Sequence, residues 1–191
     1  MSHDEVLSVI THYVDRAHGE QLRKYSSDRY VVHPVRVMQT CALYTKDIHV
    51  LAAALLHDVL EDTSITKEAM DVFLTPLLGS VNAQRTLSLV IELTDIYTRT
   101  NYPRLNRKQR KALEAKRLSE CSSDAQTIKY ADVMDNSHNI IQHDPGFGPI
   151  FLKEAYDLLT VLRKGNALLY EKALEILRYD MQVKRNEKDD N

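Results

Sequence analysis

Apolar residues recur at intervals of three or four positions along almost the whole chain. In residues 4–18, Val6, Ile10 and Val14 follow this spacing, which places them on one face of an α-helix. The same spacing predicts further helices over residues 34–46, 48–60, from Ser64 or Thr66 onward, 76–97, 107–120, 124–141 and 149–179. The last segment forms one helix or two, with Gly165 as a candidate break. The pattern therefore predicts an all-α protein, a bundle of about eight to ten helices with no strand of note.

Polar residues that precede these segments predict where several helices begin. Asp47 and Asn106 can each cap the helix that follows, and Pro34 suits the first turn of its own helix. Ser123 and Gln126 have the spacing of a capping box. No internal repeat or linker divides the chain, so residues 1–182 are predicted to form one domain. The charged residues 183–191 are predicted to be a disordered tail.

Composition narrows the functional class only slightly. The 191 residues are 43% hydrophobic and 27% charged, with a net charge of −2, which favours neither a nucleic-acid polymer nor a membrane as partner. No apolar run approaches the roughly 20 residues that span a bilayer, and no signal peptide is recognisable at the N-terminus. Two isolated cysteines, Cys41 and Cys121, fit a cytoplasmic protein. Homo-oligomerisation is left open.

An unusual concentration of ionisable residues follows an apolar run. The stretch LLHDVLEDTSIT, residues 55–66, holds His57, Asp58, Glu61 and Asp62. On a continuous helix, His57 would lie on the apolar face and Asp58 about 100° further round the axis. Burying this acidity would cost several kcal/mol, as an order of magnitude, and a divalent cation could offset that cost. A lone helical histidine is more often a satisfied core or surface residue, so the residues alone leave both interpretations open.

Two further residues are candidate metal ligands. His33 precedes Pro34, which favours an extended backbone at that position. Asp132 borders the apolar stripe of its predicted helix, although a single acid in this position is usually solvated. Together with His57 and Asp58 they supply two imidazoles and two carboxylates and no thiolate. Such a set fits Mn²⁺ or Fe²⁺, or else Mg²⁺ or catalytic Zn²⁺.

These residues resemble the H…HD…D pattern of the HD-domain metal phosphohydrolases, and most closely the (p)ppGpp hydrolase branch. That branch contains the RelA/SpoT hydrolase domains and the small stand-alone alarmone hydrolases. The similar stretches are AHGEQLRKYSSDRYVVHP, AAALLHDVLEDT, EAKRL and AQTIKYADVMDN, which keep their order over about residues 17–140. The resemblance implies an HD-domain helical bundle.

The resemblance also implies roles for individual residues. The implied ligands of a Mn²⁺-like ion are His33, His57, Asp58 and Asp132. Glu61 and Asp62 are the implied acid pair that orients or deprotonates the attacking water. Asn136 matches an asparagine at the nucleotide pocket, and Arg23 and Lys24 match an Arg-Lys pair near the base and phosphates. The implied reaction removes the 3′-diphosphate of ppGpp or pppGpp and yields pyrophosphate with GDP or GTP.

Three positions depart from the pattern of that branch. Val133 stands where the branch usually has Arg or Lys, and Asp135 where it has His or Tyr. Arg29 replaces the proline of its PYI.HP motif. Because all three lie near the expected substrate pocket, the exact nucleotide stays open.

A basic segment gives a second reason to expect a phosphorylated substrate. Residues 104–117 hold seven basic residues and one acid, and Arg107 and Arg110, near the predicted helix start, are the best candidates to receive a diphosphate. A solvated basic surface is the equally supported alternative. Lys129 can contact phosphate or pair with a carboxylate, and the pairing is favoured.

Three other functions compete with the alarmone hydrolase. One is a general HD nucleotidase that releases orthophosphate from nucleoside monophosphates. Another is a catalytically idle HD module that binds a nucleotide, although the intact acid pair opposes it. The last is a helical adaptor in which the four candidate ligands are coincidental.

Overall fold

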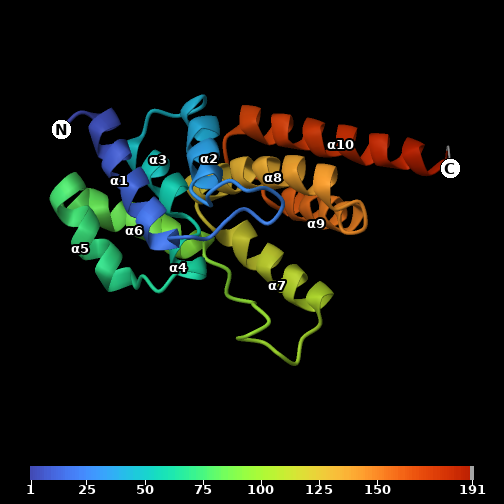
Figure 1. The fold of residues 1–191 in the computed structure, drawn as a ribbon, viewed down its shortest axis with the longest axis horizontal. Helices are drawn as coiled ribbons and strands as arrows, with labels where there is room; N and C mark the ends of the chain where they lie inside the picture. The colour runs from blue at the N-terminus through green and yellow to red at the C-terminus, as the bar shows by residue number, and fades with distance from the viewer. Residues whose placement is uncertain (190–191) are drawn as a thin grey trace. The chain divides into compact units, whose positions relative to one another are not determined.

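The computed structural model describes the backbone of residues 1–189. It also describes their side chains, except at positions 138, 139, 141, 142 and 183–189. Within these limits the chain forms ten helices and no strand, and the helices are labelled in Figure 1. One isolated antiparallel bridge joins Leu22 and Arg29. The predicted all-α class is confirmed. None of the helices in the described part of the chain is both long and apolar enough to span a bilayer.

The chain divides into two compact units, Met1–Asp95 and Ile96–Asn191. The first contains α1 (His3–His18), α2 (Val32–Ala42), α3 (Ile48–Leu56), α4 (Val59–Asp62), α5 (Lys67–Leu78) and α6 (Ser80–Leu93). Helix α3 is its centre, because α1, α2 and α6 all pack on it and every residue from His49 to Leu56 is buried. The continuous apolar sequence of α3 explains this position, since a helix that is hydrophobic on all sides must be covered on all sides.

The second unit contains α7 (Arg107–Glu120), α8 (Ser123–His143), α9 (Gly148–Val161) and α10 (Ala167–Asp189). Helices α8, α9 and α10 pack on one another, and α7 packs on α9. The predicted break at Gly165 is confirmed between α9 and α10. A side chain there would meet the Tyr130 ring at 2.4 Å, so the close approach of the backbone requires glycine. The predicted tail, 183–191, lies outside the residues whose side chains are described.

Some predicted helix boundaries are confirmed and others are wrong. The side chains of Asp47 and Asn106 cap α3 and α7 as expected. The predicted helix 76–97 is instead divided at Gly79, whose φ of 77° ends α5 before α6 begins. The predicted helix 48–60 ends at Leu56, and α4 follows after a two-residue break.

The predicted capping box of Ser123 and Gln126 is also wrong. Ser122 is the N-cap of α8 and accepts a hydrogen bond from the Ala125 N–H. The buried amide of Gln126 donates instead to backbone carbonyls at the end of α7, among them that of Leu118. Its oxygen accepts the Lys164 N–H at 2.9 Å. Gln126 therefore joins two chain segments of the second unit and does not cap its own helix.

Candidate metal centre

His57 and Asp58 form the break between α3 and α4. Both residues keep right-handed helical angles, with φ −97° and ψ −8° at Asp58, but they form a turn between the two helices. The predicted continuous helix through both residues is therefore corrected. The His57 Nδ1 lies 2.8 Å from the Ala54 carbonyl oxygen, so the nitrogen that faces this acceptor carries a proton. In neutral His57 the lone pair is then on Nε2.

His33 joins this pair from the first turn of α2, so the extended backbone predicted for it before Pro34 is wrong. The Asp58 Oδ2 lies 3.1 Å from the His57 Nε2 and 3.5 Å from the His33 Nε2. The two imidazole rings are 5.1 Å apart between centroids. One potential ligand atom from each residue falls within 4.8 Å of the other two. The fold thus brings three of the four predicted ligands together, and they are called the His33–His57–Asp58 cluster below.

The cluster has the chemistry of a divalent-metal site. Both imidazoles are almost fully buried, while the Asp58 side chain is 21% exposed. Two histidines with Nε2 atoms directed at one carboxylate give a mixed nitrogen and oxygen donor set. The contact between His57 and the Ala54 carbonyl is the type of outer interaction that fixes a ligating imidazole in one tautomer. The residues present therefore fit a divalent ion.

The predicted acid pair lies on α4, one turn beyond the cluster. The Glu61 Oε2 accepts the backbone N–H of Asp95 at 3.1 Å. Partial burial raises the pKa of Asp62 above its ordinary value, and the neighbouring Asp58 carboxylate raises it further. A hydrogen bond with Tyr30 opposes this shift in the pKa of Asp62. A carboxylate with a raised pKa is better suited to accept and return a proton near neutral pH.

Tyr30 is a residue of this region to which the sequence assigned no role. Its hydroxyl donates to the Asp58 Oδ2 at 2.6 Å. Its ring stacks on His18 with centroids 4.3 Å apart and meets His33 edge-on at 5.9 Å. The available signal was its place in RYVVHP, three residues before His33. A motif position alone does not reveal which carboxylate the hydroxyl reaches.

The predicted substrate residues Arg23 and Lys24 lie on a short hairpin between α1 and α2. The hairpin is closed by backbone hydrogen bonds from Arg23 to Asp28 and from Tyr30 to Gln21, each 2.9 Å. The Arg23 guanidinium lies 5.6 Å from the centroid of the Tyr30 ring. The Lys24 Nζ donates to the Tyr25 hydroxyl at 2.7 Å. Substrate binding by Arg23 and Lys24 stays a prediction.

In the second unit, α8 carries three predicted site residues that bond to one another. The Lys129 Nζ donates to the Asp132 Oδ2 at 2.9 Å, and the Asn136 Nδ2 donates to the Asp132 Oδ1 at 2.7 Å. Asp132 is buried. The favoured pairing of Lys129 with a carboxylate is thus present. Metal ligation by Asp132 and nucleotide contacts by Lys129 and Asn136 stay predictions for these three residues, the α8 trio.

The two arginines near the start of α7 are both engaged within the second unit. Arg107 makes a two-pronged contact with Glu154, at 2.8 and 2.7 Å, and lies 5.0 Å from the Phe147 ring centroid. This hydrogen bonding raises the pKa of Arg107. Arg110 donates to the Leu105 carbonyl. Their predicted contact with a diphosphate stays untested.

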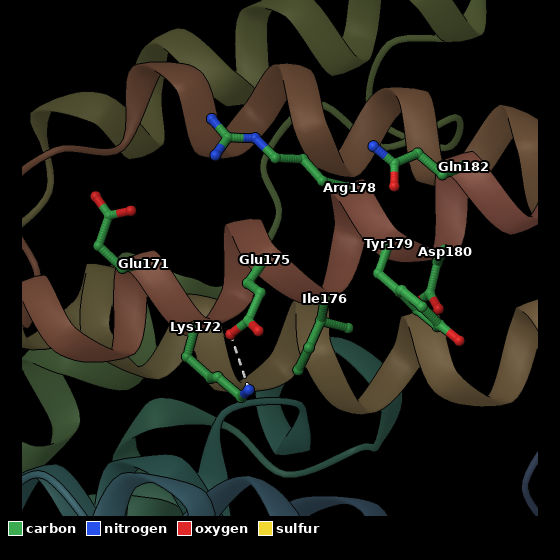
Figure 2. A pocket seen from close by; sticks show the side chains of 8 residues that line it. All are labelled: Glu171, Lys172, Glu175, Ile176, Arg178, Tyr179, Asp180 and Gln182. Carbon is green, nitrogen blue, oxygen red and sulfur yellow. Dashed lines mark hydrogen bonds and ion pairs between the residues drawn. The ribbon is translucent and has the colours of Figure 1, made fainter.

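A hollow of about 650 Å³ lies along α10 (Figure 2). Charges of both signs line it, and Lys172 pairs with Glu175 at 2.9 Å. Figure 2 shows Ile176 and Tyr179 on the same helix, and none of the predicted site residues is among its lining residues. Because acidic and basic side chains both line this hollow, it favours neither an anionic nor a cationic ligand, and we assign no ligand to it.

Comparisons with known proteins agree with the geometry. The family model "HD domain" matches residues 30–137. The MESH1 guanosine-3′,5′-bis(diphosphate) 3′-pyrophosphohydrolase of Drosophila melanogaster is 31% identical over 174 residues, which cover 87% of this chain and 89% of that protein. A probable enzyme of the same name from Mycoplasma pneumoniae is 29% identical over 145 residues, which cover 71% of this chain but only 19% of that longer protein.

A solved structure is similar in fold over nearly the whole chain. It is described as a metazoan ortholog of SpoT that hydrolyses ppGpp and plays a role in starvation responses. The TM-score is 0.74 at 29% sequence identity, with 91% of this chain and 94% of that one covered.

Proposed function

Because the chain belongs to the HD domain family, we propose that it is a metal-dependent phosphohydrolase acting on ppGpp and pppGpp. It removes the 3′-diphosphate and releases pyrophosphate with GDP or GTP. The observation that carries this proposal is the convergence of His33, His57 and Asp58 within 4.8 Å, one turn before an acid pair. The relatives that match most of this chain are named for this reaction.

The proposed metal is Mn²⁺, held by the His33–His57–Asp58 cluster with Asp132 as a fourth ligand. Mixed imidazole and carboxylate ligation supports this choice over a structural zinc. A bound divalent ion would lower the pKa of a coordinated water toward neutrality and polarise a phosphate oxygen. Both oxygens of Asp132 accept hydrogen bonds on α8, so its ligation rests on the family resemblance.

The acid pair would divide the work on the attacking water. Asp62, on the turn that follows the cluster, would take the proton of the water as it attacks the phosphorus bound to the 3′ oxygen. The bond from this phosphorus to the 3′ oxygen breaks, and a proton returns to the new 3′ hydroxyl. Glu61 would orient the attacking water, since its own carboxylate is held in place by a hydrogen bond from the Asp95 N–H.

Substrate contacts are proposed from the resemblance and from charge. Arg23 and Lys24 would bind base and phosphates from their hairpin, and Asn136 would line the nucleotide pocket. Arg107 and Arg110 would attract the diphosphate, although Arg107 must then exchange its contact with Glu154. The setting of this reaction would be the cytoplasm, with no nucleic-acid polymer or membrane as partner.

The test is incubation of the Mn²⁺-loaded full chain with ppGpp, pppGpp and a panel of nucleoside monophosphates, with pyrophosphate and orthophosphate measured separately. The proposal predicts pyrophosphate from the first two and little orthophosphate from the panel. Orthophosphate from monophosphates would instead identify a general nucleotidase. Stoichiometric Mn²⁺ without any turnover would identify an idle binding module, and absence of bound metal would favour an adaptor.

A further inference from the structure

A stack of aromatic rings leads from the end of α1 to the Asp58 carboxylate. His18, the last residue of α1, lies face to face with Tyr30 at 4.3 Å and an interplanar angle of 24°. The Tyr30 hydroxyl then donates to the Asp58 Oδ2 at 2.6 Å, a short distance typical of a charge-assisted hydrogen bond. The same Asp58 oxygen lies nearest to the imidazoles of the cluster.

The local backbone holds this stack in place. Gln21 acts twice, because its side-chain oxygen lies 3.0 Å from the His18 Nδ1 and its carbonyl accepts the Tyr30 N–H at 2.9 Å. Arg29 pairs with Asp15 at 3.1 Å and also donates to the Gly19 carbonyl. The hairpin that ends at Tyr30 is thus tied to the last turn of α1.

The second ring nitrogen of His18, Nε2, bears on the role of this side chain. The side chain is buried, with 7% of its surface exposed, and its Nε2 has no hydrogen-bond partner among the described residues. A role as a ring that supports Tyr30 needs no bond at this nitrogen. A phenylalanine at position 18 would keep the stacking surface and lose the contact with Gln21 and the electrostatic interaction with Asp62.

We propose that Tyr30 is a positioning residue for the metal centre, and that His18 acts through it. The phenol hydroxyl donates to Asp58 and also lies in hydrogen-bonding reach of Asp62. It fixes the rotation of the Asp58 carboxylate, and the stacked imidazole fixes the phenol. The inference rests on the metal site of the proposed function. Asp58 needs such support because it sits in a helix break and is only partly buried, so its helix does not restrain it. Outer hydrogen bonds of this kind orient metal ligands and typically change metal affinity or activity by 10–100-fold.

The test compares matched variants of the full chain by Mn²⁺ titration, with free Mn²⁺ followed by electron paramagnetic resonance. Tyr30→Phe removes the hydroxyl and keeps the ring, and it should weaken Mn²⁺ binding by roughly 10–100-fold. Tyr13→Phe is the control, because Tyr13 also stacks on an aromatic ring, that of Phe73, and is not one of the residues proposed to hold or position the ion. The Mn²⁺ affinity of Tyr13→Phe should equal that of the wild type.

Two variants at position 18 separate stacking from general destabilisation. His18→Phe should bind Mn²⁺ nearly as well as the wild type, whereas His18→Ala should lose part of the affinity. Thermal unfolding of each variant checks that the fold persists. Equal loss in both variants would contradict the stacking role of His18.

Further outcomes separate this inference from the proposed function. Mn²⁺ affinity of Tyr30→Phe equal to that of the wild type would overturn the positioning role. A raised KM with unchanged Mn²⁺ affinity would also overturn it and would place Tyr30 against the nucleotide. Wild-type Mn²⁺ binding without ppGpp hydrolysis would remove only the substrate proposal, and the affinity ratios would still decide the role of Tyr30. A wild type that binds no Mn²⁺ would contradict both proposals.

Discussion

The His33–His57–Asp58 cluster and the α8 trio surround a carboxylate in two different ways. In the cluster, the first turn of α2 and the break after α3 supply side chains that are 24 positions apart, and two buried imidazoles face Asp58. In the trio, Lys129 and Asn136 lie three and four positions from Asp132 on the same helix. The first arrangement needs a tertiary fold, while the second follows from helical spacing alone.

This difference in arrangement decides which of the two groups is evidence for a function. Burying two imidazoles with their Nε2 atoms beside one carboxylate costs free energy unless an additional interaction, such as a bound cation, offsets it. In the α8 trio, lysine and asparagine donate hydrogen bonds to both oxygens of the aspartate, which is compatible with a purely structural role. The cluster therefore carries the functional argument, and Asp132 enters it through resemblance. The predictions below test this contrast, beginning with the largest expected effect.

The largest effect should come from Asp58→Asn. This change keeps the size of the side chain but removes the negative charge that faces both imidazoles. We expect Mn²⁺ affinity and ppGpp hydrolysis to fall by more than about 100-fold, because even outer contacts of a ligand are worth 10–100-fold. Mn²⁺ titration and pyrophosphate release measure the two losses. Asp157→Asn, on the exposed face of α9, is the control.

The next effect separates the members of the acid pair. Asp62→Asn should lower kcat by about 100-fold or more, as expected for loss of a general base, and should leave Mn²⁺ affinity near that of the wild type. Glu61→Gln should lose less, because an amide oxygen can still accept the Asp95 N–H. Single-turnover rates at saturating Mn²⁺ give the comparison. A greater loss in Glu61→Gln would reverse the assigned roles.

A smaller effect tests whether Asp132 belongs with the cluster. As a fourth ligand, Asp132→Asn should weaken Mn²⁺ binding by at least about tenfold. If the carboxylate serves only the α8 trio, the variant will bind Mn²⁺ normally. Lys129→Gln is the companion variant: it should reduce the free energy of unfolding by about 1–3 kcal/mol, since a buried carboxylate loses a charged hydrogen-bond donor. Calorimetry and Mn²⁺ titration distinguish the two roles.

The smallest effect on stability should come from Arg107→Gln. The arginine of its ion pair with Glu154 is half exposed, so the loss in unfolding free energy should not exceed about 1 kcal/mol. If Arg107 attracts the diphosphate, KM for ppGpp should rise and kcat should stay constant. A KM equal to that of the wild type would assign the basic start of α7 to a structural role.

The sequence predicted the parts of the fold that depend on local chemistry. Helical periodicity, the caps at Asp47 and Asn106 and the break at Gly165 were predictable because neighbouring residues determine them. The division at Gly79 was missed, because a single glycine within a helical pattern is often tolerated. Gln126 was misread because its partners lie at the end of α7 and at Lys164.

The candidate site shows the same limit. The residue types made His33, His57 and Asp58 candidate ligands, since a histidine and an acid after an apolar run are unusual. The resemblance to the H…HD…D pattern was needed to choose the metal site over a structural interpretation. The helix break at Asp58 was not predictable from LLHDVLED, whose residues are compatible with one continuous helix. The role of Tyr30 was hidden as well, because its hydroxyl reaches an acid 28 positions away.

Anomalous diffraction from a crystal soaked in Mn²⁺ tests the central claim most directly. The account predicts one strong manganese peak within coordination distance of the Nε2 atoms of His33 and His57 and of a carboxylate oxygen of Asp58. A manganese peak elsewhere, with these three side chains bound to no common ion, would contradict it.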